Sequence, residues 1–295
     1  MTLITFALTP EYVVMASDRR LTTTQRGRVI DQSDRATKST LLWGQMLMGY
    51  TGVAILDRIP MEFWAAERLA GVRPNEAPEV LANAMNDYYS KHRELQGVPH
   101  HFMMAGFAYN PARSPASWPM GVEVGNCTWV ATGDRVTVSP DVTEFTARRK
   151  HVGNQGVIVG AVGAPYSLSG LRRLRREVKF AARSKPNDPA LVFEKMVEFT
   201  RTTAASSGGT VGDAVTVSSL PRSVIPRRIE GWSIPLSPEG MAGAKLEPHT
   251  RTYYPGDSAE TTQWMPAIVY PDLQLAGMAF AVGSTAPNPP DFPSG

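Results

Sequence analysis

The chain has 295 residues, 42% of them hydrophobic, and its formal net charge is +3 at pH 7. A sizeable core can therefore be buried in one large domain or two small ones, and the small net charge argues against nucleic acid as a partner. No apolar stretch approaches the roughly 18 residues of a transmembrane helix, and no signal peptide is evident. The single cysteine, Cys127, excludes an internal disulfide and a cysteine-based zinc site. We expect a cytoplasmic protein without a membrane partner.

The N-terminal part of the chain reads as two hairpins followed by two helices. Apolar and β-branched runs separated by short turn sequences predict four strands, over residues 2–8, 12–17, 36–42 and 45–48. Apolar residues that recur at a period near 3.6 then predict helices over 54–70 and 77–95.

The rest of the domain again combines strands with two helices. Further strands are predicted at 102–109, 127–131, 136–138, 157–162 and 214–218. Between the last two, one helix is predicted to begin at Pro165, and another begins with Asp188 as its N-cap and Pro189 at the first helical position. This order of strands and helices indicates an α+β fold with two packed sheets between two helical layers.

The composition changes after residue 220, where prolines become frequent. We therefore divide the chain into a domain over 1–220 and a C-terminal extension over 221–295. The extension is expected to have little regular structure, a strand over 276–282 at most, and a disordered end. Its aromatic residues are typical of anchors on a neighbouring subunit, namely Trp232, Tyr253, Tyr254 and Trp264.

The two N-terminal hairpins bring reactive side chains together. If the first turn centres on Pro10, Thr2 lies opposite Asp18, at the open end of the hairpin. If the second turn lies at residues 43 and 44, Lys38 lies opposite Gly49. Both pairings depend on the register of the strands.

These residue types suit a nucleophilic hydrolase. A threonine hydroxyl needs a base, and a free α-amine can be that base because its unperturbed pKa of about 7.7–8.0 lies near working pH. Methionine aminopeptidases remove Met1 before a small residue such as Thr2. Lys38 would then favour the neutral amine, and Asp18 would hold Lys38 in place. The backbone of Gly49 would donate an N–H to the developing oxyanion.

Five stretches of the sequence resemble proteasome-type β subunits, and in particular the bacterial proteasome-like peptidase that works with a ring unfoldase. They are residues 2–6, 14–20, 36–38 and 48–52, together with Gly163-Ala-Pro-Tyr166. The resemblance covers about residues 2–220. It implies a four-layer αββα sandwich of the N-terminal-nucleophile hydrolase type, assembly into homo-oligomeric rings or spirals, and peptide substrates, with an unfoldase as a possible partner.

The resemblance also implies roles for single residues. Thr2 would be the nucleophile, Asp18 and Lys38 its supporting pair, and Gly49 the oxyanion donor. Arg20 matches an arginine that follows the aspartate in many proteasome subunits. No cofactor or metal is implied.

Two positions depart from the family pattern. A serine that supports the amine falls on Val162, and a second carboxylate falls on Ala204. Ser206, Ser207 and Asp213 are the candidates to replace them. The sequence therefore predicts an N-terminal threonine hydrolase that cleaves peptide or other amide bonds through an acyl-enzyme. A catalytically silent ring subunit and a small-molecule amidase on the same fold remain alternatives.

Overall fold

The computed structural model describes residues 2–25, 28–33, 36, 38–42, 46–70, 72, 73, 75–110, 114–139, 141–151, 156–222, 249–253, 262–264, 267–270, 273–275 and 279–281. Within these residues the protein contains four α-helices and several sheets in which almost all strand pairs are antiparallel. The predicted α+β class is therefore confirmed. In the same residues, no helix has the length and apolar character that a membrane crossing requires.

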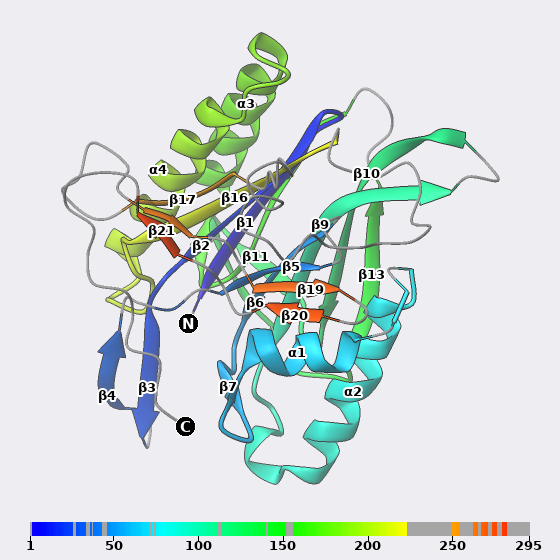
Figure 1. Cartoon of the computed structure of the whole chain (residues 1–295). Helices are drawn as coiled ribbons and strands as arrows, with labels where there is room; N and C mark the ends of the chain where they lie inside the picture. The colour runs from blue at the N-terminus through cyan, green and yellow to red at the C-terminus, as the bar shows by residue number, and fades with distance from the viewer. Residues whose placement is uncertain are drawn as a thin grey trace.

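The first large sheet contains both strands of the N-terminal hairpin. Its seven strands, in spatial order, are β14 (Ile158–Gly163), β1 (Leu3–Leu8), β2 (Tyr12–Asp18), β16 (Val215–Pro221), β17 (His249–Tyr253), β18 (Thr262–Trp264) and β21 (Ala279–Ala281). Strand β1 is thus flanked by β14 and β2, and β2 lies between β1 and β16. Figure 1 labels β1, β2 and β16 in the part of the molecule that α3 and α4 cover.

The second large sheet contains the other N-terminal hairpin. Its order is β13 (Thr146–His151), β10 (Ser114–Gly125), β9 (His101–Asn110), β6 (Met46–Thr51), β5 (Ser39–Leu42), β19 (Ala267–Tyr270) and β20 (Leu273–Leu275). All of its pairs are antiparallel except β19 with β5. Smaller sheets are formed by β3 (Leu21–Gln25) with β4 (Arg28–Ser33), by β7 (Ile55–Leu56) with β8 (Ile59–Pro60), and by β11 (Trp129–Thr132), β12 (Arg135–Val138) and β15 (Tyr166–Ser167).

Each large sheet carries a pair of helices on one face. Helices α3 (Leu168–Ser184) and α4 (Ala190–Ser206) share an apolar cluster with the first sheet, and α1 (Met61–Leu69) and α2 (Ala77–Lys91) share another with the second sheet. A short 3-10 turn, Arg93–Leu95, follows α2. Side chains alternate along β1: Leu3 and Ala7 belong to the helix-side cluster, whereas Ile4, Phe6 and Leu8 belong to a third cluster with residues of the second sheet.

The third cluster joins the two large sheets. It contains Leu41, Leu47, Met103 and Ala105 from the second sheet, and Val13, Met15 and Val162 from the first. The strands β1, β2, β5 and β6 are buried along their whole length, as expected for strands that read as continuous apolar runs.

The predicted helix over 54–70 begins later than expected. Residues 55–60 form the small hairpin of β7 and β8, and α1 begins at Met61. The backbone of Asp57 and Arg58 has positive φ angles of 50° and 67°, as in a type I′ hairpin turn. Ile55, the first large apolar residue of the predicted helix, is 56% exposed.

The other helices agree with prediction to within a few residues. Helix α3 begins at Leu168 rather than at Pro165, because Ser167 caps it by accepting a hydrogen bond from Gly170 N. The N-cap of α4 is Pro189, and the Asp188 carboxylate accepts from Ala190 N at 3.0 Å. The pattern missed the strands β3, β4, β10 and β13.

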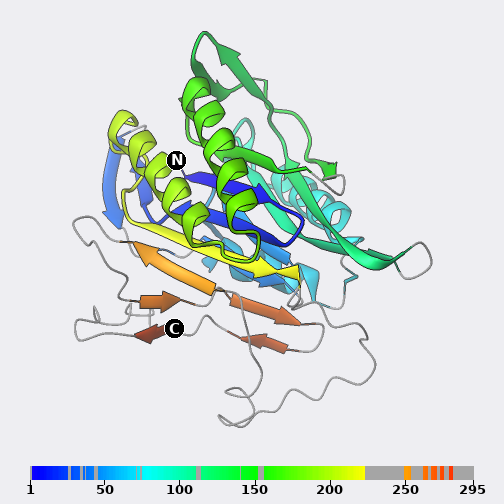
Figure 2. The ribbon, with the colours of Figure 1, turned by 90° about the horizontal axis from the view of Figure 1, so that it is seen from above.

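The C-terminal extension differs from its prediction. Its described residues form five short strands, of which β17 extends the first sheet beyond β16 and β19 extends the second sheet beyond β5. Figure 2 shows these strands together along one side of the molecule. Strand β21 falls within the stretch 276–282 in which a strand was considered. Of the four proposed aromatic anchors, Trp232 and Tyr254 lie outside the described residues, as do the last ten residues of the chain.

Candidate active site

Thr2 is fixed at the head of β1 by its own carbonyl group. The Thr2 carbonyl oxygen accepts hydrogen bonds from Ala164 N at 2.8 Å and from the Thr51 hydroxyl at 3.0 Å. These donors come from the segment after β14 and from the end of β6, so both large sheets hold this residue. The alternation of β1, continued by one residue, puts the Thr2 side chain on the same face as Ile4, toward the second sheet.

The Asp18 carboxylate accepts hydrogen bonds from several parts of the chain. Its Oδ1 accepts from Leu3 N at 2.7 Å, and its Oδ2 accepts from Arg20 N at 3.1 Å and from Gly212 N at 3.2 Å. The carboxylate also binds Lys38 Nζ at 3.1 Å. Donors from four separate segments therefore converge on one buried carboxylate, which connects the residue after Thr2 to the loop after α4.

Lys38 lies just before β5, and its side chain extends to the Asp18 carboxylate. Its ammonium group binds the carbonyl oxygen of Arg20 as well as Asp18 Oδ2. The side chains of Lys38 and Asp18 are both 0% exposed. A buried charge is costly unless it is paired and hydrogen-bonded. The fold meets this requirement, because each of the two charged groups binds the other and also binds backbone groups.

The predicted registers of both hairpins are wrong by one residue. In the first, Ile4 lies opposite Ser17, because the turn is closed by Thr9 N and Tyr12 O with Pro10 and Glu11 between them. In the second, Ser39 rather than Lys38 lies opposite Gly49. The predicted turn at residues 43 and 44 lies outside the described residues.

Despite the slip, Thr2, Asp18 and Lys38 lie together. Asp18 reaches the N-terminal end of β1 through Leu3 N, and Lys38 reaches Asp18 through its long side chain. The grouping predicted from sequence is thus present, although side-chain reach rather than direct cross-strand pairing produces it.

Gly49 lies deeper than the other predicted residues. It is aligned with Ser39 on one side and with Met103 on the other, inside the second sheet. A β-carbon at this position would lie 2.8 Å from Met15 Sδ and 3.3 Å from Ile4 Cδ1, so glycine allows the two sheets to approach closely here. Its role as an oxyanion donor stays a prediction. The residue of β6 that contacts Thr2 is Thr51.

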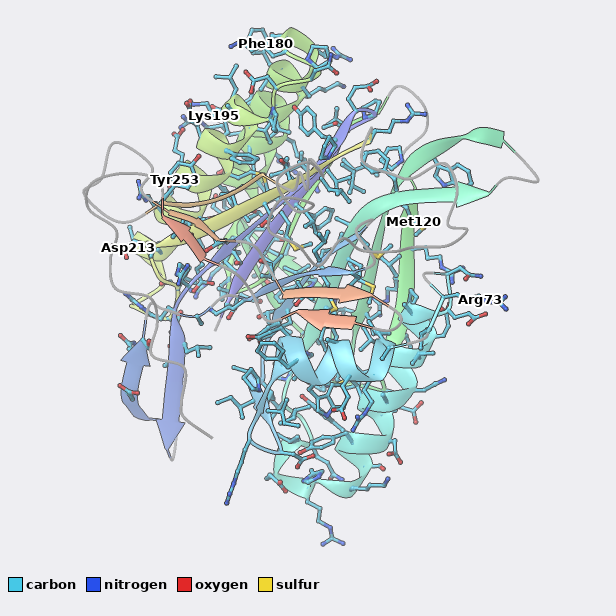
Figure 3. All side chains as sticks on the ribbon, viewed as in Figure 1. Arg73, Met120, Phe180, Lys195, Asp213 and Tyr253 are labelled. Atoms are coloured by element: carbon cyan, nitrogen blue, oxygen red, sulfur yellow. The ribbon has the colours of Figure 1, made fainter. Side chains whose placement is uncertain are left out.

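The supporting residues flank Asp18 on the side of the loop after α4. Arg20 Nη1 donates to the carbonyl oxygens of Gly209 at 3.2 Å and of Val211 at 3.5 Å. The Ser207 hydroxyl donates to Ala204 O and accepts from Val211 N, so it shapes this loop. Asp213 lines, with Arg20, a groove of about 420 Å³ whose other lining residues are Arg201, Ala204, Ala205, Gly209 and Val211. Figure 3 labels Asp213 at this edge of the molecule.

The two departures from the family pattern have different surroundings. Val162 is buried in the cluster between the sheets and lies opposite Ile4. Ala204 is half-buried in the last turns of α4 and lines the groove.

Sequence reasoning missed Gly163 and Thr51. Gly163 has φ of +111°, and a β-carbon there would lie 1.8 Å from the Thr2 carbonyl oxygen, so only glycine fits. Thr51 is the last residue of the apolar strand β6 and is buried. A polar residue at the end of an apolar strand was the signal in the sequence that could have identified it.

Sequence reasoning also missed a pair of acidic groups near Lys38. The Tyr50 hydroxyl donates to Glu62 Oε2 at 2.9 Å. Burial raises the pKa of Glu62, and the positive charge of Lys38 opposes this rise. Burial likewise raises the pKa of Tyr50, and the negative charges of Glu62 and Asp18 raise it further. Lys38 therefore lies in the field of two carboxylates rather than one.

Comparison of the chain with protein-family models and with curated proteins gave no match.

Proposed function

We propose that the chain is an N-terminal threonine hydrolase of the proteasome-like type, with an αββα sandwich fold, that cleaves peptide bonds through an acyl-enzyme. The observation that carries this proposal is the convergence on Asp18. One buried carboxylate binds the backbone next to Thr2 and the ammonium group of Lys38. This arrangement holds a cation close to the position where the α-amine of Thr2 would lie.

The proposed reaction begins when Met1 is removed and the Thr2 amine becomes free. The hydroxyl of Thr2 attacks the amide carbon while its proton passes to the α-amine. The tetrahedral intermediate collapses, the amine of the substrate leaves with that proton, and an ester on Thr2 remains. Water then attacks the ester carbon and gives a proton to the α-amine. The bond between the acyl carbon and the Thr2 oxygen breaks, the carboxylic acid leaves, and the Thr2 oxygen takes back the proton. Lys38 supports this cycle because a nearby positive charge favours the neutral amine and stabilises negative charge at the reacting centre.

The layered arrangement of the chain supports the sandwich part of the proposal. Three apolar clusters separate α3 and α4, the first sheet, the second sheet, and α1 with α2. The Thr2 side chain lies on the face of β1 that is directed between the two sheets, where a substrate carbonyl would have to enter.

A catalytically silent ring subunit is the second candidate, and one observation favours it. Val162 presents a buried apolar side chain where the family pattern has a serine. In that case the ion pair of Asp18 and Lys38 would only stabilise the fold and would take no part in a reaction.

Covalent labelling separates the two candidates. The purified protein is treated with an electrophile that requires both a hydroxyl and a free α-amine, and intact mass and peptide mapping locate the adduct. We expect one adduct on Thr2, loss of the adduct in Thr2→Ala, and no loss in Thr5→Ala, which alters another buried threonine of β1. Full retention of Met1, or an unlabelled protein with Thr2 at its terminus, would leave only the silent subunit.

A further inference from the structure

The outer face of α3 carries an unusual concentration of positive charge. The helix contains six basic residues and one acidic residue, Glu177. Four of the basic residues recur at intervals of three or four positions and therefore lie along one line of the helix surface. We call them the basic stripe: Arg172, Arg176, Lys179 and Arg183.

The charges of the stripe are not neutralised within the helix pair. Glu177 binds Arg173, which also binds Glu198 of α4. In the part of the chain that the structure describes, Arg176, Lys179 and Arg183 have no hydrogen-bond or ion-pair partner, and all four stripe residues are exposed. Arg172 lies close enough to the Asp134 carboxylate for its positive charge to lower the pKa of that group.

A large apolar side chain lies beside the stripe. Phe180 is 73% exposed, more than any other large hydrophobic residue among those described. It follows Lys179 directly, and Figure 3 labels it at the outer end of α3. The opposite face of α3 is anchored in the core by Leu171, Leu174 and Val178. The stripe is therefore displayed on a rigid platform, which lowers the entropic cost of binding.

We propose that the basic stripe and Phe180 bind an extended acidic segment of a partner protein. From Arg172 to Arg183 the stripe spans roughly 16 Å at 1.5 Å per residue. In an extended chain, side chains on one face repeat about every 6.6 Å, close to the rise of about 6 Å between residues four apart in a helix. Acidic residues at alternate positions can thus face successive cations. An apolar residue among them would cover Phe180.

The composition of this surface favours an acidic peptide, because one peptide can supply both carboxylates for the cations and an apolar residue for Phe180. Three of its four cations are arginines, whose planar guanidinium group binds a carboxylate through two parallel hydrogen bonds. Four basic residues lie within the roughly four to eight found in clusters that bind anionic lipid, so lipid vesicles are included among the competing ligands. The same face of a second copy is excluded as the occupant, because it would bring two positive stripes together.

A binding assay with a defined peptide tests the proposal. The full-length protein is titrated into a fluorescein-labelled peptide with Glu at alternate positions and Leu at its centre, and anisotropy is recorded at low and at physiological salt. We expect saturable binding that weakens with salt, because exposed charges are screened over about 8 Å at 0.15 M. The same peptide with Lys in place of Glu should not bind.

Matched variants locate the binding surface. Arg176→Glu should weaken binding about tenfold, because one attraction is replaced by a repulsion, whereas Arg73→Glu makes the same charge change at an exposed site outside α3 and should have no effect. Phe180→Ser should weaken binding severalfold, whereas Ile55→Ser, at another exposed hydrophobic residue, should not. Circular dichroism checks that each variant is folded.

Four results would overturn the proposal. They are equal weakening by Arg176→Glu and Arg73→Glu, no binding of the acidic peptide at low salt, tighter binding to phosphatidylserine vesicles or to single-stranded DNA than to the peptide, and self-association that Arg176→Glu abolishes. None of these measurements depends on turnover or on Thr2.

Discussion

A β-carbon on Gly163 would lie 1.8 Å from the carbonyl oxygen of Thr2. Gly163 also has φ of +111°, which residues with a side chain rarely adopt. We therefore expect Gly163→Ala to destabilise the protein by more than about 3 kcal/mol and to displace Thr2, because the obstructing atom belongs to the backbone. Urea unfolding measures the stability, and labelling of Thr2 by the electrophile measures the displacement.

Gly133→Ala is the matched control for this prediction. Gly133 also has a positive φ, of 61°, but a β-carbon there would meet nothing within 4 Å. Its substitution should cost only about 1–2 kcal/mol for the left-handed backbone conformation. Equal losses in the two variants would mean that the contact between Gly163 and Thr2 contributes nothing beyond backbone strain.

The buried pair of Asp18 and Lys38 predicts strong coupling. Lys38→Met leaves the Asp18 carboxylate with backbone donors alone, and Asp18→Asn leaves the Lys38 ammonium without its carboxylate. Each change should cost about 3–5 kcal/mol, because an uncompensated charge stays buried. The double variant should lose much less than the sum of the two. A double-mutant cycle by urea unfolding measures this difference, and additive losses would show that the two groups stabilise the fold independently.

The sequence predicted the two N-terminal hairpins and the grouping of Thr2, Asp18 and Lys38, but not the register. Register is read from the alternation of apolar and polar residues. Every residue of β1 and β2 is buried, so this alternation is absent. The turn decides instead: the Thr9 hydroxyl accepts from Tyr12 N and donates to Tyr12 O, which leaves two residues in the loop.

Local sequence patterns could not predict the long-range contacts of the candidate site. The contacts of Thr2 with Thr51 and Ala164 join parts of the chain far apart in sequence, and so does the contact of Asp18 with Gly212. The extension illustrates the same limit. Strands β17 and β19 are short strands that form by pairing with the edges of existing sheets, so their own sequences give a weak signal.

His100 predicts a loss of stability in acid. Burial lowers the pKa of His100 to about 3, below the usual value of about 6.5. Between these values the unfolded chain binds a proton that the folded chain does not, so stability falls as pH decreases from about 6.5 toward 3. The slope from this residue approaches about 1.4 kcal/mol per pH unit.

Substitution of His100 tests this assignment. His100→Gln should flatten the dependence of unfolding free energy on pH between about 6 and 4, although it also disturbs the hydrogen bond that Nδ1 accepts from Val53 N. An unchanged slope in His100→Gln would assign the acid sensitivity to other groups.

Val162 lies in the apolar layer between the two large sheets. A serine at this position should therefore lower the stability of the protein. Val162→Ser buries a hydroxyl among apolar side chains such as Ile4. We expect a loss of about 1–3 kcal/mol beyond that of Val162→Ala, which removes the same methyl groups without adding a polar atom. Thermal unfolding of the two variants measures the difference. A serine variant as stable as the alanine variant would show that the hydroxyl finds a hydrogen-bond partner in this layer.

The extension should act within its own chain as well as in any assembly. Strand β17 covers the edge of β16, and β19 covers the edge of β5 directly after Lys38. The buried Arg19 side chain donates to the hydroxyls of Thr216 and Thr252, so it joins β16 to β17. A chain that ends at Arg222 would expose both sheet edges, and exposed edges promote aggregation. We therefore expect the truncated chain to aggregate, and light scattering measures this.

Thr252→Val tests the same contact without truncation. It keeps the shape of the side chain and removes the hydroxyl that binds Arg19 and lies 3.3 Å from the Thr216 hydroxyl. The expected cost is about 1–3 kcal/mol, because a charged donor loses a buried acceptor. Thr250→Val, in the same strand, is the control for β propensity. If Thr252→Val and the truncated chain both unfold at the same urea concentration as the intact protein, then the extension is not part of the folded domain, and its strands have to be assigned to contacts with another subunit.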